Sequence, residues 1–331
     1  MSHKIKIKPS GHHFSVEARA CVLKAGLREG VNLDHNCANG GCGECKARLI
    51  SGELEQIRHH DFRLSDEEKA KCYFLMCCHR PASDLVIEAH ESDKAEDIPE
   101  QHITAKVSKI EQLQDDVLQL NVRTPRSKGL HFLAGQGVSL NFDGMKPKVL
   151  PIASCPCDGI QLRFHVRRRT HDPFSELLFD RIKKGREVVI SGPIGDFTLN
   201  EESGRPLILV AWETGFAPIS SLIDHIIQKD EEREIHLYWL SEIEHGHYLS
   251  NYCRAWCDAL DNFHYHSIDL QPSGDDTFDS IFRYIATQHQ PLMDWDIYLT
   301  LPAAKQYRAC NLLCDAGMPA DQMNVALLQH P

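Results

Sequence analysis

The sequence of 331 residues lacks long apolar runs, an excess of basic residues and a leader at its start. No stretch approaches the roughly 20 consecutive apolar residues of a membrane-spanning helix. Lys and Arg number 36 and Asp and Glu 47, so the formal net charge is −11, which argues against a nucleic-acid partner. No basic-then-apolar segment precedes Lys4, so we expect no export signal and a cytoplasmic protein.

Common hydrolase and zinc-site motifs are missing as well. The 20 histidines never recur in an H-x3-H or H-E-x2-H spacing, so no zinc site is expected from them. No G-x-S-x-G element, phosphate-binding P-loop or internal repeat is visible. With 42% hydrophobic residues the chain can build real cores, and its length allows about two or three domains.

Cysteine, in contrast, is frequent. Thirteen cysteines in a chain without a leader indicate a reducing compartment rather than a disulfide framework. Two pairs have the i,i+4 spacing of one helix face and a third pair flanks a proline: Cys253/Cys257, Cys310/Cys314 and Cys155/Cys157. Metal binding stays open for them, but burial as small hydrophobic side chains is the favoured interpretation.

The segment from Cys37 to Cys45 reads C-A-N-G-G-C-G-E-C, a C-x4-C-x2-C pattern in a glycine-rich loop. A fourth thiol follows at Cys77, within an L-x-C sequence. This is the plant-type [2Fe–2S] spacing, in which four thiolates surround two irons and two sulfides. The loop glycines permit close backbone approach, and their N–H groups can point at sulfur. The pattern predicts a [2Fe–2S] cluster held by Cys37, Cys42, Cys45 and Cys77.

Two alternatives compete with this interpretation, namely a zinc site and a set of buried cysteines. Zinc ribbons favour paired C-x2-C knuckles, and only one such pair occurs here. Cys78 is a possible competitor for the fourth ligand position, but the L-x-C sequence favours Cys77.

The pattern of apolar residues predicts three domains. In the first, 4–8 and 12–17 form a hairpin, 18–28 a helix and 46–50 a strand, as in a small β-grasp domain. An acidic, proline-containing linker follows. From His102 to about Asn200 the pattern is mostly strand with one helix at 173–183, which fits a closed antiparallel barrel.

From Arg205 onward, strands and helices alternate, which predicts an open parallel sheet with helices on both faces. The expected strands are 206–211, 234–240, 263–268 and 296–300, and the expected helices are 216–228, 248–260, 277–288 and 303–315. The fold class is therefore α+β and multidomain. The predicted boundaries are 1–92, a linker at 93–101, 102–203 and 204–331.

The first ninety residues resemble plant-type ferredoxins, and the whole chain resembles a family of reductases. Its members are the NADH-dependent reductase components of bacterial oxygenases and the iron–sulfur reductase of deoxysugar synthesis. The matching segments are 132–136, 192–197, 214–218 and 236–239. The resemblance implies that NAD(P)H gives hydride to FAD in the barrel, and that the flavin passes single electrons to the cluster and on to a protein acceptor.

The resemblance also implies which residues would bind the cofactors. The flavin signature R-x-Y-S aligns with Lys148-Val149-Leu150-Pro151, and the flavin phosphates would lie near Arg167, Phe174 and Ser175. The dinucleotide would lie near Thr214, Gly215 and Phe216. No catalytic side chain is predicted. The Arg-rich segment around Arg167 is either an anion or docking patch or a solvated face with structural ion pairs.

Four segments depart from the family's signature sequences. Lys148 lacks the bidentate fork of arginine, and Leu150 and Pro151 replace the stacking tyrosine and hydrogen-bonding serine. The family's G-G-x-F-S turn is H-D-P-F-S at 171–175 in this chain. Its G-G-T-G segment is W-E-T-G at 212–215, and its C-G-P segment is T-L-P at 300–302. An alternative function is therefore a redox-sensing, regulatory or scaffold protein that has lost flavin or nicotinamide binding. A ferredoxin carrier with inert passenger domains is less favoured.

Overall fold

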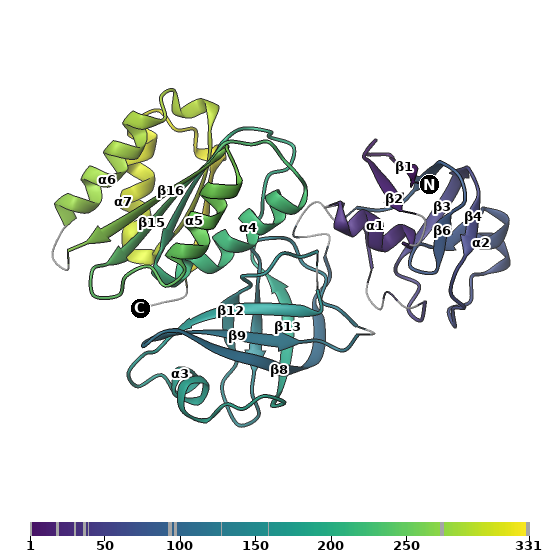
Figure 1. Ribbon diagram of the computed structural model, residues 1–331, viewed down its shortest axis with the longest axis horizontal. Helices are drawn as coiled ribbons and strands as arrows, with labels where there is room; N and C mark the ends of the chain where they lie inside the picture. Colours follow the sequence, from purple (N-terminus) through teal and green to yellow (C-terminus); the bar gives the residue numbers. More distant parts are fainter. Residues whose placement is uncertain are drawn as a thin grey trace.

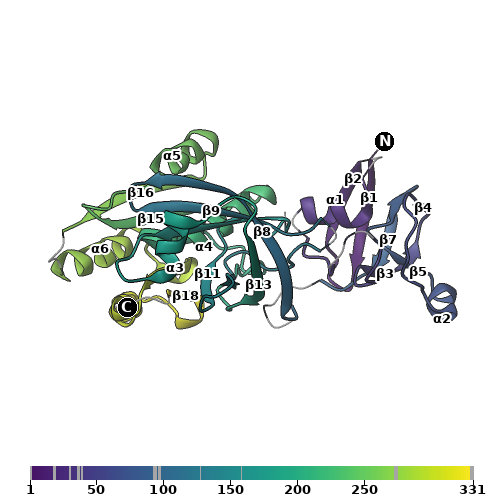
Figure 2. The ribbon, with the colours of Figure 1, turned by 90° about the horizontal axis from the view of Figure 1, so that it is seen from below.

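The computed structural model has one large sheet, of five or six strands, in each of the three predicted domains (Figures 1 and 2). The structure describes residues 2–17, 20–29, 31–35, 38, 40–91, 95, 98–126, 128–157, 159–271 and 275–328. Within these residues no helix is both long and apolar enough to cross a membrane.

The first sheet has five strands in the order β2-β1-β7-β3-β5. They are β1 (Ser2–Lys8), β2 (His13–Glu17), β3 (Lys46–Ser51), β5 (Tyr73–Leu75) and β7 (Leu85–Glu88). Ile5 and Ile7 alternate with polar residues along β1 and are fully buried, which is the pattern of a half-buried strand. Helix α1 (Val22–Arg28) packs its apolar side on this core, and the arrangement confirms the β-grasp prediction.

Some elements of this domain differ from the prediction. Helix α1 begins at Val22 rather than at residue 18, and residues 18 and 19 lie outside the described ones. Helix α2 (Asp66–Ala70) was not predicted, because it buries no residue and so has no apolar periodicity. A capping box between Ser65 and Glu68 stabilises its start. The short pair β4 (Leu54–Gln56) and β6 (His79–Pro81) was also missed.

The second sheet is antiparallel and curls into a nearly closed barrel, in the order β11-β10-β13-β8-β9-β12 (Figure 1). Its strands are β8 (Gln101–Gln114), β9 (Val117–Arg123), β10 (Gly137–Asn141), β11 (Lys148–Pro151), β12 (Gln161–Arg167) and β13 (Glu187–Ile194). The predicted helix at 173–183 is shorter: α3 (Pro173–Glu176) continues as a π-helical turn over Leu177–Arg181. Inward-facing residues such as Leu120, Phe142 and Phe164 fill the barrel.

The third sheet is parallel, in the order β16-β15-β14-β17-β18. Its strands are β14 (Leu207–Trp212), β15 (Ile235–Glu242), β16 (Phe263–Leu270), β17 (Asp296–Pro302) and β18 (Met323–Leu328). Helices α4 (Phe216–Gln228) and α5 (Ser250–Ala259) pack on one face, against residues such as Leu237. Helices α6 (Asp275–Gln288) and α7 (Ala303–Asp315) pack on the other, against residues such as Tyr238. Two separate cores on one sheet confirm the doubly wound prediction.

Few polar contacts join the first domain to the others. Gln228 Nε2 on α4 donates to the carbonyl oxygen of Arg28 at 3.0 Å, and Asn32 Nδ2 donates to Glu201 Oε1 at 3.5 Å. The rings of His35 and His131 lie 4.8 Å apart between centroids. In Figure 2 the first domain extends to one side of the other two, which lie against each other.

Candidate metal centre and cofactor positions

The strand pairing brings two of the predicted ligand cysteines together. Cys45 directly precedes β3, and Cys77 is the second residue after β5; these strands pair antiparallel with Lys46 opposite Leu75. The register is extended by a hydrogen bond from Met76 N to the carbonyl oxygen of Cys45 at 2.9 Å. Both thiols are buried, whereas Cys42 is half-buried at the loop. Cys37, the fourth predicted ligand, lies outside the described residues.

The two buried thiols are close enough to share a hydrogen bond. This bond, together with burial, raises the pKa of Cys77, and the same bond lowers the pKa of Cys45. Two buried thiols in contact with each other are a soft donor set of the kind that iron–sulfur clusters require. The described cysteines therefore fit a [2Fe–2S] cluster, and Cys42, Cys45 and Cys77 are the predicted ligands among them.

Cys78 is also buried, and its Sγ lies 3.5 Å from Cys77 Sγ. A Cβ added to Gly40 would lie 2.7 Å from Cys78 Sγ, so this thiol faces the glycine-rich loop. The geometry thus keeps both adjacent thiols near the loop. The choice of Cys77 as the fourth ligand stays a prediction, favoured by its contact with Cys45.

Two glycines of the loop are required by close packing. Gly40 and Gly43 have φ of +91° and +83°, in the region that favours glycine. A Cβ on Gly43 would lie 2.3 Å from the ring of Phe62, and one on Gly40 would lie 2.6 Å from the Cβ of His60. The loop is therefore held against residues 60–62, and a larger side chain at either position would displace it.

In the barrel, Lys148 of the flavin-signature segment forms an ion pair with Asp172 of the turn predicted to hold the flavin phosphates. Lys148 Nζ on β11 lies 2.8 Å from Asp172 Oδ2, just before α3. Asp172 also caps α3, because its Oδ1 accepts from Phe174 N at 3.2 Å. His171, at a position where the family has glycine, has φ of +63°. A flavin diphosphate at this turn would meet the Asp172 carboxylate and would have to displace it from Lys148.

The other predicted flavin residues are engaged structurally. Phe174 is buried against Phe142, with ring centroids 5.9 Å apart. Ser175 Oγ accepts from Arg169 N at 2.9 Å and donates to the Arg169 carbonyl oxygen at 3.1 Å. Val149 is half-buried on β11, beside the buried Leu150. The polar groups of this turn are thus satisfied by one another.

Arg167 joins the barrel to the parallel sheet. It is buried at the end of β12, where it pairs with Asp116, and its Nε lies 3.5 Å from Glu213 Oε2. Nearby, Arg163 pairs with Asp224 and Arg168 with Asp180. These ion pairs favour the structural interpretation of the Arg-rich segment over an open anion patch.

The turn after β14 is occupied by Glu213. Its φ of +46° is the conformation that glycine favours, consistent with the family's glycine at this position. Its carboxylate also lies 2.7 Å from His245 Nδ1, and its carbonyl oxygen accepts from Trp239 Nε1 at 3.1 Å. A carboxylate at this turn would repel a dinucleotide pyrophosphate.

The predicted dinucleotide residues Thr214, Gly215 and Phe216 follow directly. Phe216 begins α4 and stacks on Trp239, with centroids 4.1 Å apart. Trp212 lies against Phe278, and Lys305 Nζ lies 5.4 Å from the Trp212 ring. Thr214, Gly215 and Phe216 therefore lie in the turn after β14 and at the start of α4, and their assignment to a dinucleotide, like that of the flavin residues, stays a prediction.

Sequence reasoning missed the residues that join barrel and sheet. His165 on β12 is fully enclosed, stacks on Phe216 at 6.2 Å and contacts Tyr248, whose OH lies 3.1 Å from His165 Nδ1. Burial, with a smaller contribution from Arg163, lowers the pKa of His165 to about 3. Phe216 is 51 residues and Tyr248 is 83 residues from His165 in sequence, so no local pattern indicated these contacts.

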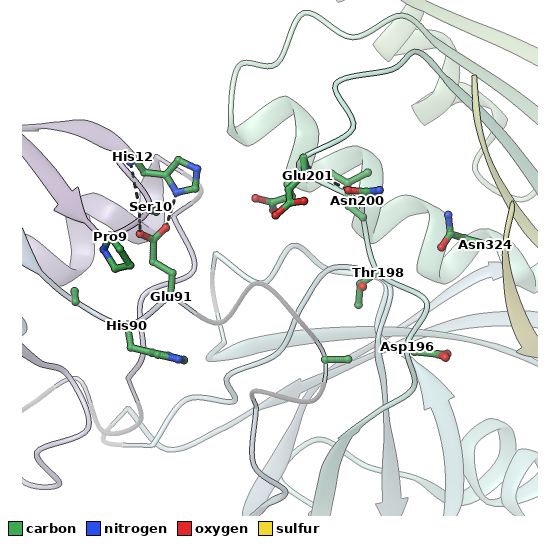
Figure 3. Close-up of a pocket in the computed structure, with 14 residues that line it drawn as sticks. Pro9, Ser10, His12, His90, Glu91, Asp196, Thr198, Asn200, Glu201 and Asn324 are labelled. Carbon is green, nitrogen blue, oxygen red and sulfur yellow. Dashed lines mark hydrogen bonds and ion pairs between the residues drawn. The ribbon is translucent and has the colours of Figure 1, made fainter. Parts of the chain in front are cut away.

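A cavity of about 940 Å³ lies between the first domain and the other two (Figure 3). Glu91 accepts from Ser10 Oγ at 2.5 Å and contacts His12 Nδ1 at 2.6 Å on one wall, and Glu201 lies on the other. Glu201 is held by His225 and Lys229 at 2.9 and 2.6 Å. The cavity is acidic, and its lining includes none of the predicted flavin residues.

The sequence matches the family model of the 2Fe-2S iron-sulfur cluster binding domain over residues 5–82. It is 31% identical to the CDP-6-deoxy-L-threo-D-glycero-4-hexulose-3-dehydrase reductase of Yersinia pestis over 277 residues, covering 84% of this chain and 82% of that protein. It is 26% identical to the reductase component of propane 2-monooxygenase from Gordonia, covering 97% and 96%.

The fold also matches solved structures. The ferredoxin reductase in carbazole 1,9a-dioxygenase superposes with a TM-score of 0.59 over 99% of both chains, at 21% identity. The modular phthalate dioxygenase reductase gives a TM-score of 0.56 over 68% of both chains, at 18% identity. Together with the identity to the Yersinia reductase, the comparisons establish the lineage: the chain belongs to the family of [2Fe–2S] reductases that draw on NAD(P)H and FAD, and it is an iron–sulfur electron-transfer oxidoreductase.

Proposed function

We propose that Cys37, Cys42, Cys45 and Cys77 hold the [2Fe–2S] cluster and that electrons leave it for a separate acceptor protein. The observation that carries this proposal is the contact between the buried thiols of Cys45 and Cys77 at the paired ends of β3 and β5. The cluster supplies one-electron transfer when bound. The thiols of Cys45 and Cys77 are buried in the domain, whereas the half-buried Cys42 lies nearer to solvent.

The acceptor that we propose is a dehydrase acting on a nucleotide-linked deoxyhexulose. Support comes from the names of relatives that are 31% identical over more than four fifths of this chain. An oxygenase is the second candidate, because relatives named as oxygenase reductase components are 25–30% identical. We further propose a cytoplasmic location and domains at 1–92, 102–203 and 204–331, joined by a linker at 93–101.

Cysteine variants test the ligand assignment. Cys45→Ser removes a thiolate from the cluster, so we expect iron content and visible absorbance to fall severely. Cys72→Ser is the matched control, since Cys72 is exposed in the same domain. Equal iron content and absorbance in both variants would contradict the assignment of Cys45.

The direction of electron flow is tested with the purified wild-type protein under anaerobic conditions. We expect dithionite to reduce the cluster, which is followed by electron paramagnetic resonance, and the added acceptor protein to reoxidise it. A cluster that stays reduced with both kinds of acceptor would contradict the proposed partners while leaving the ligand assignment intact.

A further inference from the structure

An imidazole-rich cluster lies on the third domain, away from the cofactor positions. Glu234 immediately precedes β15, His236 is the second residue of β15, and His264 is the second residue of the edge strand β16. The two strands pair in parallel with His236 directly opposite His264, so both rings emerge at the same end of the sheet. This is the amino end of the strands, opposite the turn that carries Glu213.

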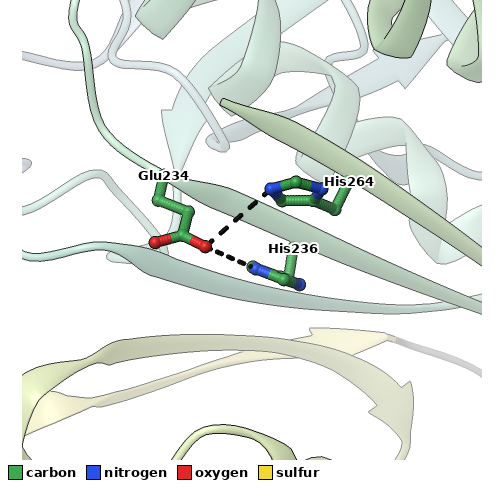
Figure 4. A group of neighbouring side chains, drawn as sticks. All are labelled: Glu234, His236 and His264. Atoms are coloured by element: carbon green, nitrogen blue, oxygen red, sulfur yellow. Dashed lines mark hydrogen bonds and ion pairs between the residues drawn. The ribbon is translucent and has the colours of Figure 1, made fainter. Parts of the chain in front are cut away.

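The three side chains converge on one point (Figure 4). Glu234 Oε1 lies 3.0 Å from His236 Nε2 and 3.8 Å from His264 Nε2. One ligand atom from each side chain lies within 4.8 Å of the others. Ligands about 2.0–2.1 Å from a tetrahedral zinc ion are separated by roughly 3.4 Å, so small side-chain movements would complete this coordination.

Neighbouring rings fix the orientation of His236. Its Nδ1 lies 3.4 Å from His266 Nε2, and its Nε2 donates to Glu234 Oε1 at 3.0 Å, so a metal ion bound at Nε2 would replace the proton of that hydrogen bond. His289 and Trp295 pack against it with centroids 4.5 and 5.5 Å away. A histidine ligand held through its second nitrogen in this way is typical of metal sites.

We propose that Glu234, His236 and His264 form a binding site for a divalent transition-metal ion, with Zn²⁺ as its occupant. Two imidazoles and one carboxylate are the donor set of borderline cations such as zinc, and the exposed position leaves a fourth coordination place for water. The bound ion would tie the edge strand β16 to β15 and to the segment before it. The site is separate from the cluster cysteines in chemistry and in position.

The test uses the full-length protein with its cluster intact. Protein is dialysed against limiting zinc, and the bound zinc is measured by mass spectrometry for wild type, His236→Ala, His264→Ala and Glu234→Gln. We expect wild type to retain one zinc ion per chain more than the two histidine variants, with a smaller loss in Glu234→Gln. His102→Ala, which removes an exposed histidine from the barrel, should keep the wild-type content.

Zinc-edge X-ray absorption identifies the ligands without interference from iron. We expect nitrogen and oxygen neighbours at about 2.0–2.1 Å with imidazole scattering. Sulfur neighbours at about 2.3 Å would place the zinc on cysteines and overturn the proposal. Loss of zinc in His245→Ala but not in His264→Ala would also overturn it, because His245 belongs to the other carboxylate–histidine group, with Glu213 and Glu242.

Discussion

At the scale of single residues, the adjacent thiols of Cys77 and Cys78 differ in what they contact. Cys77 shares a hydrogen bond with Cys45, whereas Cys78 lies beneath Gly40. The L-x-C sequence identified Cys77 as the ligand, and the pairing of β3 with β5 is consistent with that choice. The contacts of Cys78 could not be deduced from sequence, because they depend on how the loop folds over β5.

We expect Cys77→Ser to lose most of the cluster and Cys78→Ser to keep it. Serine oxygen is a much harder donor than thiolate and binds iron–sulfur clusters poorly. Iron content and visible absorbance of the two anaerobically purified variants provide the measurement. The reverse ranking would move the fourth ligand from Cys77 to Cys78.

The Lys148–Asp172 ion pair leads to a second prediction at this scale. Asp172→Asn removes a negative charge from the flavin phosphate turn and keeps an oxygen to cap α3, so FAD should bind more tightly. One charge repulsion of about 1 kcal/mol corresponds to roughly a five-fold gain in affinity. Quenching of flavin fluorescence on titration measures it.

The control is Asp180→Asn, which removes a carboxylate paired with Arg168 on the adjacent turn. Equal FAD affinity in wild type and Asp172→Asn would show that this carboxylate does not oppose a flavin diphosphate.

At the scale of elements, the packing of β12 on α4 buries His165 as a neutral imidazole. The unfolded chain protonates His165 below its ordinary pKa of 6.5, whereas the folded chain does so only near pH 3. Because the unfolded state binds more protons in this range, the free energy of unfolding falls as the pH drops below 6.5. Between pH 7 and 5.5 this one side chain contributes a loss of about 1 kcal/mol.

We therefore expect His165→Gln to flatten the pH dependence of stability by about 1 kcal/mol between pH 7 and 5.5. Urea unfolding followed by tryptophan fluorescence is suitable, because Trp239 and Trp256 both pack on Phe216, which stacks on His165. His102→Gln, an exposed histidine of the same barrel, should keep the wild-type slope. An unchanged slope in His165→Gln would contradict the assigned burial.

Most strands and helices could be predicted from sequence because their apolar residues recur with the period of the element. The run over Leu207–Ala211 is buried on both faces and therefore continuously apolar, as a central parallel strand requires. Helix α2 was not predicted, because it buries no residue and is stabilised by a capping box and by ion pairs such as Lys46–Glu68. The cluster motif was local and visible, whereas the carboxylate partners of Lys148 and Arg167 became apparent only in three dimensions.

At the scale of the whole molecule, the first domain contacts the rest through few polar groups. Inter-domain surfaces of this kind permit relative motion. We expect the double variant His131→Ala/Gln228→Ala to loosen the first domain, because it removes the His35–His131 ring contact and the hydrogen bond to Arg28. Small-angle X-ray scattering should then give a larger radius of gyration.

Cluster absorbance should stay at the wild-type level in that variant, because neither residue belongs to the ligand loop. Gln112→Ala, an exposed position on β8, is the control. Identical scattering of the double variant and wild type would show that other contacts hold the domains together.

We propose above all that cysteine thiolates of the first domain bind a [2Fe–2S] cluster. The most direct measurement is the iron, acid-labile sulfide and zinc content of protein purified without oxygen. We expect equal amounts of iron and sulfide, and we expect both to be lost together in Cys45→Ser. Sulfur-ligated zinc in place of iron, with no acid-labile sulfide, would contradict it.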